Sequence, residues 1–139
     1  MPSLGVKLGR AYARDLIDSA YSHCNIIIPV PLHNLRKKER GYNQSELIAL
    51  GVGEILNIPV LTDALVRNVN NPTQTDKHRF ERWENVSDIF SVLNPNRIEG
   101  RHILLIDDVI TTGSTIEACA KELLSVKGVR VSVAVLAMA

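Results

Sequence analysis

The run ILLIDDVITTGST, residues 103–115, constrains the fold of this chain more than any other part of it. Its first four residues are aliphatic, which is typical of a strand that is buried on both faces within a parallel sheet. Two acids, Asp107 and Asp108, come at the carboxyl end of this strand, and a loop of small polar residues follows them. Apolar periodicity then predicts a helix over residues 116–126, which a Lys-Gly pair ends. We therefore expect a strand, a loop and a helix of an α/β fold here.

The rest of the chain alternates between helical and strand-like patterns in the same way. Apolar residues at helical spacing and β-branched runs between turn residues predict the other elements. These are helices over residues 4–21 and 44–56, and strands over residues 25–31, 58–66, 86–92 and 129–138. Asn43 is the expected N-cap of the second helix. This alternation predicts an open, mainly parallel, twisted sheet that is flanked by helices.

The first predicted helix carries a regular apolar stripe. We expect its buried face to consist of Leu4, Leu8, Ala11, Tyr12, Leu16, Ile17 and Ala20. A chain of 139 residues has the length of one domain, so we expect residues 1–139 to form a single one. Within it we expect an N-terminal helical segment, residues 1–24, and a core, residues 26–138.

The charge balance and the cysteines argue against several classes of protein. Sixteen Lys and Arg residues against fifteen Asp and Glu residues give a net charge of +1, which offers no bulk attraction to nucleic acid or to an anionic membrane. No apolar run is long enough to cross a bilayer, and the start of the chain lacks a signal-peptide pattern. Cys24 and Cys119 form no CxxC pair, so we expect two free thiols in a reducing compartment, with one disulfide bond as the alternative. We therefore expect a cytoplasmic protein whose domain neither enters a membrane nor binds nucleic acid directly.

The loop after the acids has the composition of a phosphate-binding loop. Amide groups in the first turn of a helix have no helical partner, and the helix dipole is positive there, so a phosphate group binds well. Hydroxyl side chains add donors, and a glycine lets the backbone approach the ligand. The candidate phosphate-binding residues are Thr111, Thr112, Gly113, Ser114 and Thr115. The alternative is simple N-capping of the helix, which accounts for one acid and one hydroxyl group but not for the whole set.

The two acids before this loop suit a sugar and a cation better than a phosphate. The carboxylates of Asp107 and Asp108 repel a phosphate, but they accept hydrogen bonds from neighbouring sugar hydroxyls and can hold Mg²⁺ directly or through water. A ribose 5-phosphate offers both a phosphate and a diol. Two other phosphate sites are excluded, since the sequence has no GxxxxGK[ST] motif and no GxGxxG motif after a strand. The acid pair of a phospho-accepting receiver domain would lie near the start of its domain, whereas this pair lies near the end.

Residues 103–115 resemble the phosphoribosyl-pyrophosphate (PRPP) signature of the type I phosphoribosyltransferases. The run PVPLHNLRKKERGYNQSELIA, residues 29–49, is similar to the ComF branch of that family, and the resemblance covers roughly residues 26–137. Further matches to this branch are Arg67, Thr73, Gln74, Arg82, Trp83, Glu84, Asn85, Val86 and Phe90. Members of the branch often carry an N-terminal cysteine-rich zinc segment. This sequence does not include one, either because it was trimmed or because this member lacks it.

This resemblance implies a Mg²⁺-dependent glycosyltransferase, more narrowly a pentosyltransferase. Pyrophosphate would leave the anomeric carbon of PRPP, and a nitrogen nucleophile would attack that carbon with inversion. Asp107 and Asp108 would be the catalytic residues, which hold the ribose hydroxyls, stabilise the developing positive charge and bind Mg²⁺ together with PRPP. The sequence does not identify the acceptor, and we expect only a minimal hood over the site in a chain of this length.

The resemblance also implies two loops around the site. The first follows the first core strand, binds pyrophosphate and coincides with the basic cluster of the chain. Its candidate residues are Arg36, Lys37, His33 and Arg40, with a solvated basic surface as the alternative. The second, residues 67–90, is a flexible loop that closes over PRPP and excludes water. Its candidate residues are Lys77, His78, Arg79 and Arg82, with unpaired loop charges as the alternative, and Trp83 is expected to be a hinge or core anchor.

Other functions stay open at this point. One alternative is a non-catalytic module that binds PRPP or a related phosphosugar and acts in DNA uptake through protein partners, because ComF relatives are associated with natural competence. The amidophosphoribosyltransferase activity that is often ascribed to ComF-like chains needs a glutaminase domain with an N-terminal cysteine. Residue 2 is Pro2 and no length remains for such a domain, so we do not expect this activity. A homodimer is compatible with the sequence.

Overall fold

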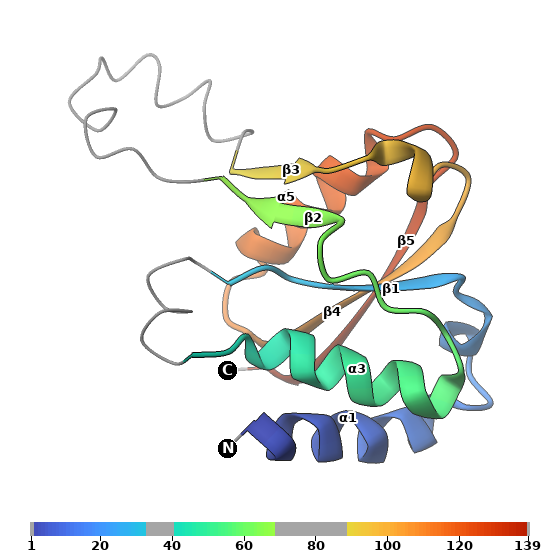
Figure 1. Cartoon of the computed structure of the whole chain (residues 1–139), viewed down its shortest axis with the longest axis vertical. Coiled ribbons are helices and arrows are strands. Elements are labelled where there is room, and N and C mark those ends of the chain that lie inside the picture. The colour runs from blue at the N-terminus through green and yellow to red at the C-terminus, as the bar shows by residue number, and fades with distance from the viewer. Residues whose placement is uncertain (1, 33–40, 69–88, 139) are drawn as a thin grey trace.

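The computed structural model describes residues 2–32, 41–68 and 89–138 (Figure 1). Its helices are α1 (Pro2–Leu16), η1 (Ala20–His23), α3 (Gln44–Leu56), η4 (Pro95–Arg97) and α5 (Ser114–Leu124), where η marks a 3-10 helix. Its strands are β1 (Ile26–Pro29), β2 (Leu65–Arg67), β3 (Phe90–Val92), β4 (His102–Ile110) and β5 (Arg130–Met138). The predicted helix over residues 44–56 is therefore present with the predicted bounds.

The central sheet consists of β1, β4 and β5, and all its strands are parallel. β4 lies in the middle, where residues 103–106 pair with residues 26–29 of β1 on one side and with β5 on the other. The side chains of residues 103–106 have no exposed surface. The prediction of an open α/β fold around a strand buried on both faces is therefore confirmed.

Two layers cover the opposite faces of this sheet (Figure 1). On one face α1 and α3 pack over a core that includes Ile27, Ile48 and Leu104. On the other face α5 and the hairpin of β2 and β3 pack over a core that includes Ile28 and Leu105. Neighbouring residues of one strand thus enter different cores, as the alternation of side chains along a strand requires.

The buried face of α1 differs from the predicted one. Gly5, Gly9 and Ala13 are buried, whereas Leu4 and Leu8 of the predicted stripe are 52% and 39% exposed. The helix also ends before its predicted end at residue 21, because the chain turns and forms η1 after a separate serine cap. The predicted buried face is therefore wrong for most of its residues, whereas Leu16 is buried and Tyr12 is partly buried, as predicted.

The close approach of α1 to α3 explains this difference. A Cβ atom added at Gly9 would lie 2.1 Å from the carbonyl oxygen of Ile48, and one at Gly51 would lie 2.2 Å from the carbonyl oxygen of Val6. Only glycine leaves room for two backbones at this separation. The glycine face of α1 therefore packs inward, and Leu4 and Leu8 face outward.

The predicted continuous strand over residues 58–66 is wrong. The chain pairs with β1 through one bridge, between Val60 and Ile27, and the amide of Ile27 donates to the carbonyl of Pro59 at 2.9 Å. A bend at residues 62–64 then separates this bridge from β2. The predicted run is therefore divided between the central sheet and the hairpin.

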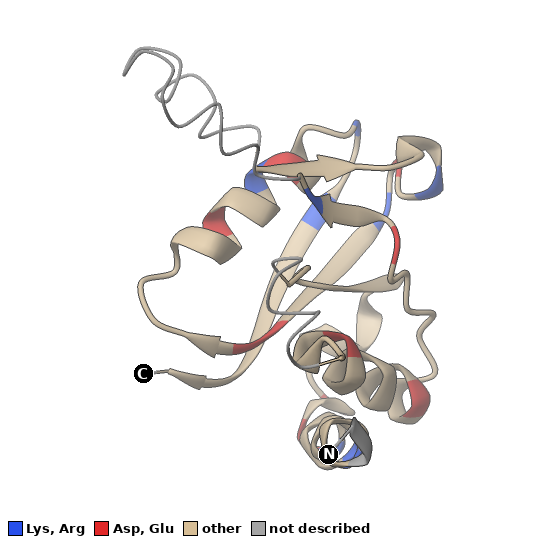
Figure 2. Cartoon of the chain, turned by 60° about the vertical axis from the view of Figure 1, so that its left-hand side comes forward, with Lys and Arg blue, Asp and Glu red and all other residues tan. Residues whose placement is uncertain are grey.

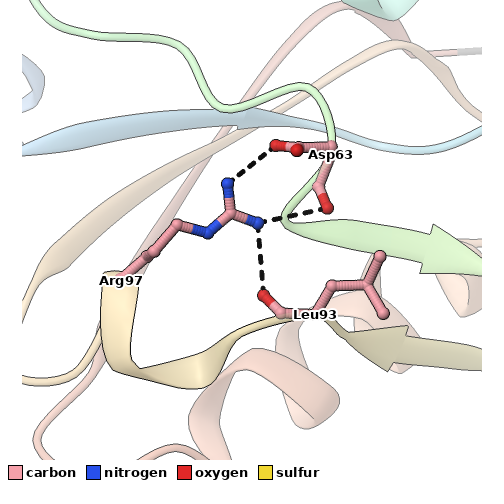
Figure 3. A network of polar contacts seen from close by, with 3 residues as sticks. All are labelled: Asp63, Leu93 and Arg97. Atoms are coloured by element: carbon pink, nitrogen blue, oxygen red, sulfur yellow. Dashed lines mark hydrogen bonds and ion pairs between the residues drawn. The ribbon is translucent and has the colours of Figure 1, made fainter.

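Arg97 holds the base of the hairpin together (Figure 3). Its Nη1 donates to Oδ1 of Asp63 at 2.8 Å, and its Nη2 lies 3.3 Å from the carbonyl oxygens of Asp63 and Leu93, to which it donates. This guanidinium lowers the pKa of the Asp63 carboxyl group by hydrogen bonding and by its charge. The segment that enters β2 is thereby joined to the segment that leaves β3.

The hairpin pairs antiparallel from Leu65 opposite Val92 to Arg67 opposite Phe90. The end of the predicted strand over residues 86–92 is present as β3, and its residues 86–88 lie outside the described residues. The predicted flexible loop, residues 67–90, connects these two strands. Its residues 69–88 lie outside the described residues.

The cysteines and the charges agree with a packed domain. Cys24 and Cys119 are both buried and free, and burial raises the pKa of the Cys119 thiol to about 12. Charged residues of both signs are spread over the elements shown in Figure 2. None of the described helices is both long enough and apolar enough to cross a bilayer.

Candidate functional site

The acid pair lies where β4 extends past the end of β1. β1 ends at Pro29, opposite Ile106, whereas β4 continues to Ile110 and stays paired with β5. Asp107 and Asp108 are therefore part of the strand rather than residues behind it, and both line a cavity at the carboxyl edge of the sheet. Ligands of open parallel sheets bind at this edge.

Asp107 is held by more hydrogen bonds than Asp108. Its Oδ1 accepts from the hydroxyl of Ser45 at 2.8 Å and from the amide of Asp108 at 2.9 Å. Burial raises the pKa of Asp107 to about 6; the hydrogen bond from Ser45 opposes this rise, and the neighbouring Asp108 carboxyl adds to it. Burial therefore makes the charged form of the Asp107 carboxylate less favourable than it would be in water.

Asn43 positions the start of α3 against the sheet. Its Oδ1 accepts from the amide of Ser45 at 3.1 Å, and its Nδ2 donates to the carbonyl of Val30 at 3.2 Å. The predicted N-cap is thereby confirmed. The same arrangement brings Ser45 to Asp107, 62 residues away in the sequence. Sequence reasoning missed Ser45, because no local pattern reports a contact over this separation.

The predicted phosphate-binding loop forms the wall of a small cavity beside the acid pair. This cavity has a volume of about 80 Å³, and residues 111–115 line it together with Asp107. The hydroxyls of Thr112 and Ser114 lie 2.9 Å apart. Gly113 has a φ of 81°, and a Cβ atom there would meet nothing within 4 Å, so the backbone conformation rather than space requires glycine. Because α5 begins at Ser114, the amides of its first turn belong to this loop.

A larger cavity, of about 540 Å³, adjoins the small one. Asp107, Val109, Thr111 and Thr115 line both cavities. The other walls of the larger cavity come from residues 30–32 after β1, the cap and first residues of α3, and the end of β2. A volume of this size is typical of small-molecule sites. The structure thus brings the predicted phosphate loop and the predicted acid pair to one continuous wall.

Arg67 brings a cation to the larger cavity. It is the last residue of β2, is half-buried, and its Cζ lies 5.4 Å from the ring centroid of Phe90, the opposite residue on β3. The ion pairs among the described residues join α1 to α3 and η4 to the segment before β2, so Arg67 belongs to neither. Sequence reasoning noted Arg67 only as a family match and assigned it no role.

The other predicted site residues lie outside the part of the chain that the structure describes. They are Arg36, Lys37, His33, Arg40, Lys77, His78, Arg79, Arg82 and Trp83. Leu32 and Asn43, which flank the first of these segments, both line the larger cavity. The assignment of the basic residues to pyrophosphate stays a prediction.

The acid pair fits a magnesium ion that arrives with a phosphorylated ligand. Mg²⁺ usually binds one or two carboxylates and takes its other ligands from substrate phosphates and water. Within residues 2–32, 41–68 and 89–138, no group of three or more His, Cys, Asp or Glu side chains could hold a metal by itself. A nearby cation would also stabilise the poorly solvated carboxylate of Asp107.

Comparison with known sequences gives a consistent result. The model of the family "Phosphoribosyl transferase domain" matches residues 2–139. Competence protein F of Haemophilus influenzae is 38% identical over 96 residues, which cover 68% of this chain and 42% of that protein. Competence protein ComFC of Bacillus subtilis is 41% identical over 108 residues, which cover 78% of this chain and 41% of that protein. The chain thus spans about two fifths of the length of these curated relatives.

Solved structures share the fold at low sequence identity. The glutamine PRPP amidotransferase of Bacillus subtilis has a TM-score of 0.70 and 20% identity, over 97% of this chain and 26% of that one. The purine phosphoribosyltransferase of Pyrococcus horikoshii has a TM-score of 0.60 and 20% identity, over 97% of this chain and 74% of that one. At this identity the likeness concerns the fold alone.

Proposed function

Because the chain belongs to the phosphoribosyl transferase domain family, in its ComF-like branch, we propose that it binds PRPP with Mg²⁺ and transfers the phosphoribosyl group to a nitrogen acceptor. One observation carries this proposal. The phosphate loop, residues 111–115, and the acid pair, Asp107 and Asp108, line two adjoining cavities that share a wall. A sugar phosphate needs these two kinds of groups side by side.

The phosphate loop would bind the 5-phosphate of PRPP. The amides of the first turn of α5 and the hydroxyls of Thr112 and Ser114 would be its donors, and the small volume suits a single phosphate group. Without ligand these two hydroxyls bond to each other, and the amide of Ser114 donates to the Thr112 hydroxyl at 3.3 Å, so a phosphate would replace these contacts. Gly113 keeps the backbone in the left-handed conformation that shapes the loop. The ribose would then extend along the shared wall toward the larger cavity.

The acid pair would hold the ribose and stabilise the reaction. The bond from the anomeric carbon to pyrophosphate breaks with its electron pair leaving on pyrophosphate, a bond to the acceptor nitrogen forms, and that nitrogen loses its proton where it carries one. The carboxylates of Asp107 and Asp108 accept hydrogen bonds from the ribose hydroxyls and stabilise the positive charge that develops on the ring. Ser45 holds Asp107 in place for this purpose. Magnesium, which the acid pair would hold together with PRPP, would neutralise the charge of the leaving pyrophosphate.

Calorimetry with PRPP and Mg²⁺ tests this proposal. The wild-type chain should bind PRPP, and Asp107→Asn or Asp108→Asn should weaken binding about tenfold to a hundredfold, because a charge-assisted hydrogen bond contributes about 1.5–3 kcal/mol. Asp18→Asn, at an exposed position before η1, is the matched control and should leave the affinity unchanged. Absence of binding by the wild-type chain, or equal binding by all variants, would contradict the proposal.

A second function is a phosphosugar-binding module without turnover, acting in DNA uptake through protein partners. The names of the relatives favour it, since they are competence proteins and, in Escherichia coli, a DNA utilization protein. Pyrophosphate release from PRPP, followed with a panel of nitrogen acceptors, separates the two functions. Release that depends on the acceptor supports the enzyme, whereas PRPP binding without release supports the module.

A cytoplasmic location is part of the proposal. Two buried cysteines without a disulfide bond fit a reducing compartment. We also propose the basic residues Arg36, Lys37, His33 and Arg40 as pyrophosphate ligands, because Leu32 and Asn43, which flank their segment, line the larger cavity.

A further inference from the structure

We infer that Ser45 is a positioning residue, which holds one carboxylate oxygen of Asp107 so that the other oxygen meets the sugar of the ligand. Ser45 thereby strengthens the preference of the site for a sugar phosphate over a simple phosphate ester. This inference rests on the proposed function and adds a residue that determines specificity from outside the acid pair and the phosphate loop. Ser45 lines the larger cavity together with Asp107, whereas the described wall of the small cavity does not include it.

Ser45 and Asn43 differ in their burial from the other polar residues of the chain. Among residues 4–32, 41–68 and 89–138, they are the polar or charged residues that are buried, with 3% and 8% of their surface exposed. A buried hydroxyl group costs free energy unless it forms a hydrogen bond. The hydroxyl of Ser45 has one proton to donate, and it donates to Oδ1 of Asp107 at 2.8 Å rather than to a carbonyl of its own helix.

Asp107 uses one of its two carboxylate oxygens within the protein. Oδ1 accepts from the hydroxyl of Ser45 at 2.8 Å and from the amide of Asp108 at 2.9 Å, and two donors occupy the acceptor sites of one oxygen. The described part of the chain offers no such donor to Oδ2, since the nearby carboxyl group of Asp108 is itself an acceptor when it is ionised. Because Asp107 lines both cavities, Oδ2 is the oxygen that is left for a ligand.

A closed ring of hydrogen bonds fixes Ser45 against the strand that carries Asp107. The amide of Val30 donates to the carbonyl of Ile106 at 2.8 Å, and the carbonyl of Val30 accepts from Nδ2 of Asn43 at 3.2 Å. Oδ1 of Asn43 accepts from the amide of Ser45 at 3.1 Å. The hydroxyl of Ser45 then donates to Asp107, the next residue of β4 after Ile106. The ring leaves β4 and returns to it one residue further on, so a shift of Ser45 would break at least one of these bonds.

This arrangement acts on the sugar and not on the phosphate. The donors proposed for the phosphate group belong to residues 111–115, which line the small cavity. The hydroxyls of the sugar would meet Asp107, whose carboxylate would rotate more freely without the hydrogen bond from Ser45. A side chain that must be ordered on binding weakens the affinity, by about threefold to tenfold for one side chain. Loss of the Ser45 hydroxyl should therefore weaken the binding of a sugar phosphate alone.

Calorimetry compares two phosphate monoesters, ribose 5-phosphate, which carries the sugar hydroxyls, and methyl phosphate, which does not. The wild-type chain should bind ribose 5-phosphate about tenfold to a hundredfold more tightly, which is the range of a charge-assisted hydrogen bond. Ser45→Ala should reduce this preference about threefold to tenfold and leave the affinity for methyl phosphate unchanged. The matched control is Ser125→Ala, which removes an exposed hydroxyl that donates to the carbonyl of Glu122 and should change neither affinity.

A double-mutant cycle shows whether Ser45 acts through Asp107. Asp107→Ala should remove most of the preference for ribose 5-phosphate. Ser45→Ala added to this variant should remove no more of it, because the hydroxyl has lost the carboxylate that it positions. A general loosening of the site would instead weaken methyl phosphate binding as well and would add to the effect of Asp107→Ala.

Each outcome decides the inference. A wild-type preference that survives in Ser45→Ala overturns it and leaves the proposed function standing, and so does an equal loss of affinity for both ligands or an additive cycle. Equal binding of both ligands by the wild-type chain contradicts the proposed contact of the acid pair with ribose, and the inference with it. If Ser45→Ala does not fold, Ser45→Cys, which keeps a group of similar size but is a weaker donor, takes its place with the same expected loss of preference.

Discussion

Glycine serves opposite purposes in two regions of this molecule, the contact between α1 and α3 and the phosphate loop. At Gly9 the space is missing, because a Cβ atom would lie 2.1 Å from a backbone oxygen of α3. At Gly113 there is space on all sides, but the φ of 81° disfavours any other residue. The helix contact therefore uses glycine for packing, and the loop uses it for a backbone shape. Substitutions that act on one requirement at a time can separate stability from binding.

The largest effect is expected at the helix contact. Gly9→Ala should lower the free energy of unfolding by about 3 kcal/mol, because the added methyl group forces α1 away from α3. Urea unfolding measures this change. Ala11, an exposed residue of the same helix, supplies the control, since Ala11→Gly should cost only about 1 kcal/mol through helix propensity. A stabilised Gly9→Ala variant would show that propensity outweighs packing here.

A smaller loss of stability, joined to a loss of binding, is expected in the loop. Gly113→Ala should lower the free energy of unfolding by about 1–2 kcal/mol, the cost of a left-handed conformation for a residue with a Cβ atom. It should also weaken binding of ribose 5-phosphate, because the loop amides shift when the backbone relaxes. Unfolding by urea and calorimetry report the two effects.

Gly100 is the matched control for this loop. It has a φ of 73°, and an added Cβ atom would also meet nothing within 4 Å, but it lies before the amino end of β4, away from both cavities. Gly100→Ala should cost as much stability and leave ribose 5-phosphate binding unchanged. Equal binding by both variants would show that the shape of the loop does not matter for the phosphate.

The features that could be predicted from the sequence are those that neighbouring residues encode, and the features that were missed depend on contacts between distant elements. The buried strand at residues 103–106 and the Asn43 cap are encoded by neighbouring residues, and the structure contains both. Neighbouring residues also encode the loop at residues 111–115, which lines a cavity, whereas its binding of phosphate stays a prediction. The buried face of α1 was missed because glycines look neutral in an apolar pattern until a second helix approaches. The contact of Ser45 with Asp107 was missed because it depends on how α3 meets β4.

The smallest effect on stability is expected in the acid pair, at Asp107. Substituting this residue should raise the free energy of unfolding at neutral pH but weaken ligand binding, so the two effects have opposite signs. The pKa of Asp107 is raised to about 6, above its ordinary value of 3.8, mainly by burial. The folded state therefore holds this proton more tightly than the unfolded state. The stabilisation is complete below about pH 4 and is lost as the pH rises through about 6. Asp107→Asn removes the charge and retains an oxygen that can accept the Ser45 hydrogen bond.

We therefore expect Asp107→Asn to match the wild-type chain in stability near pH 4 and to exceed it by about 1 kcal/mol above pH 6, a value reduced for solvent screening of a half-exposed group. Urea unfolding of both chains between pH 4 and pH 8 measures this difference in the free energy of unfolding. For the control Asp18→Asn, the difference from the wild-type chain should not change with pH. The same substitution should weaken PRPP binding. If the difference between Asp107→Asn and the wild-type chain did not change with pH, the carboxylate of Asp107 would be well solvated in the folded wild-type chain. A difference that rises with pH would mean that the folded chain carries this charge at a cost in stability, and weaker PRPP binding by the same variant would then link the charge to the ligand.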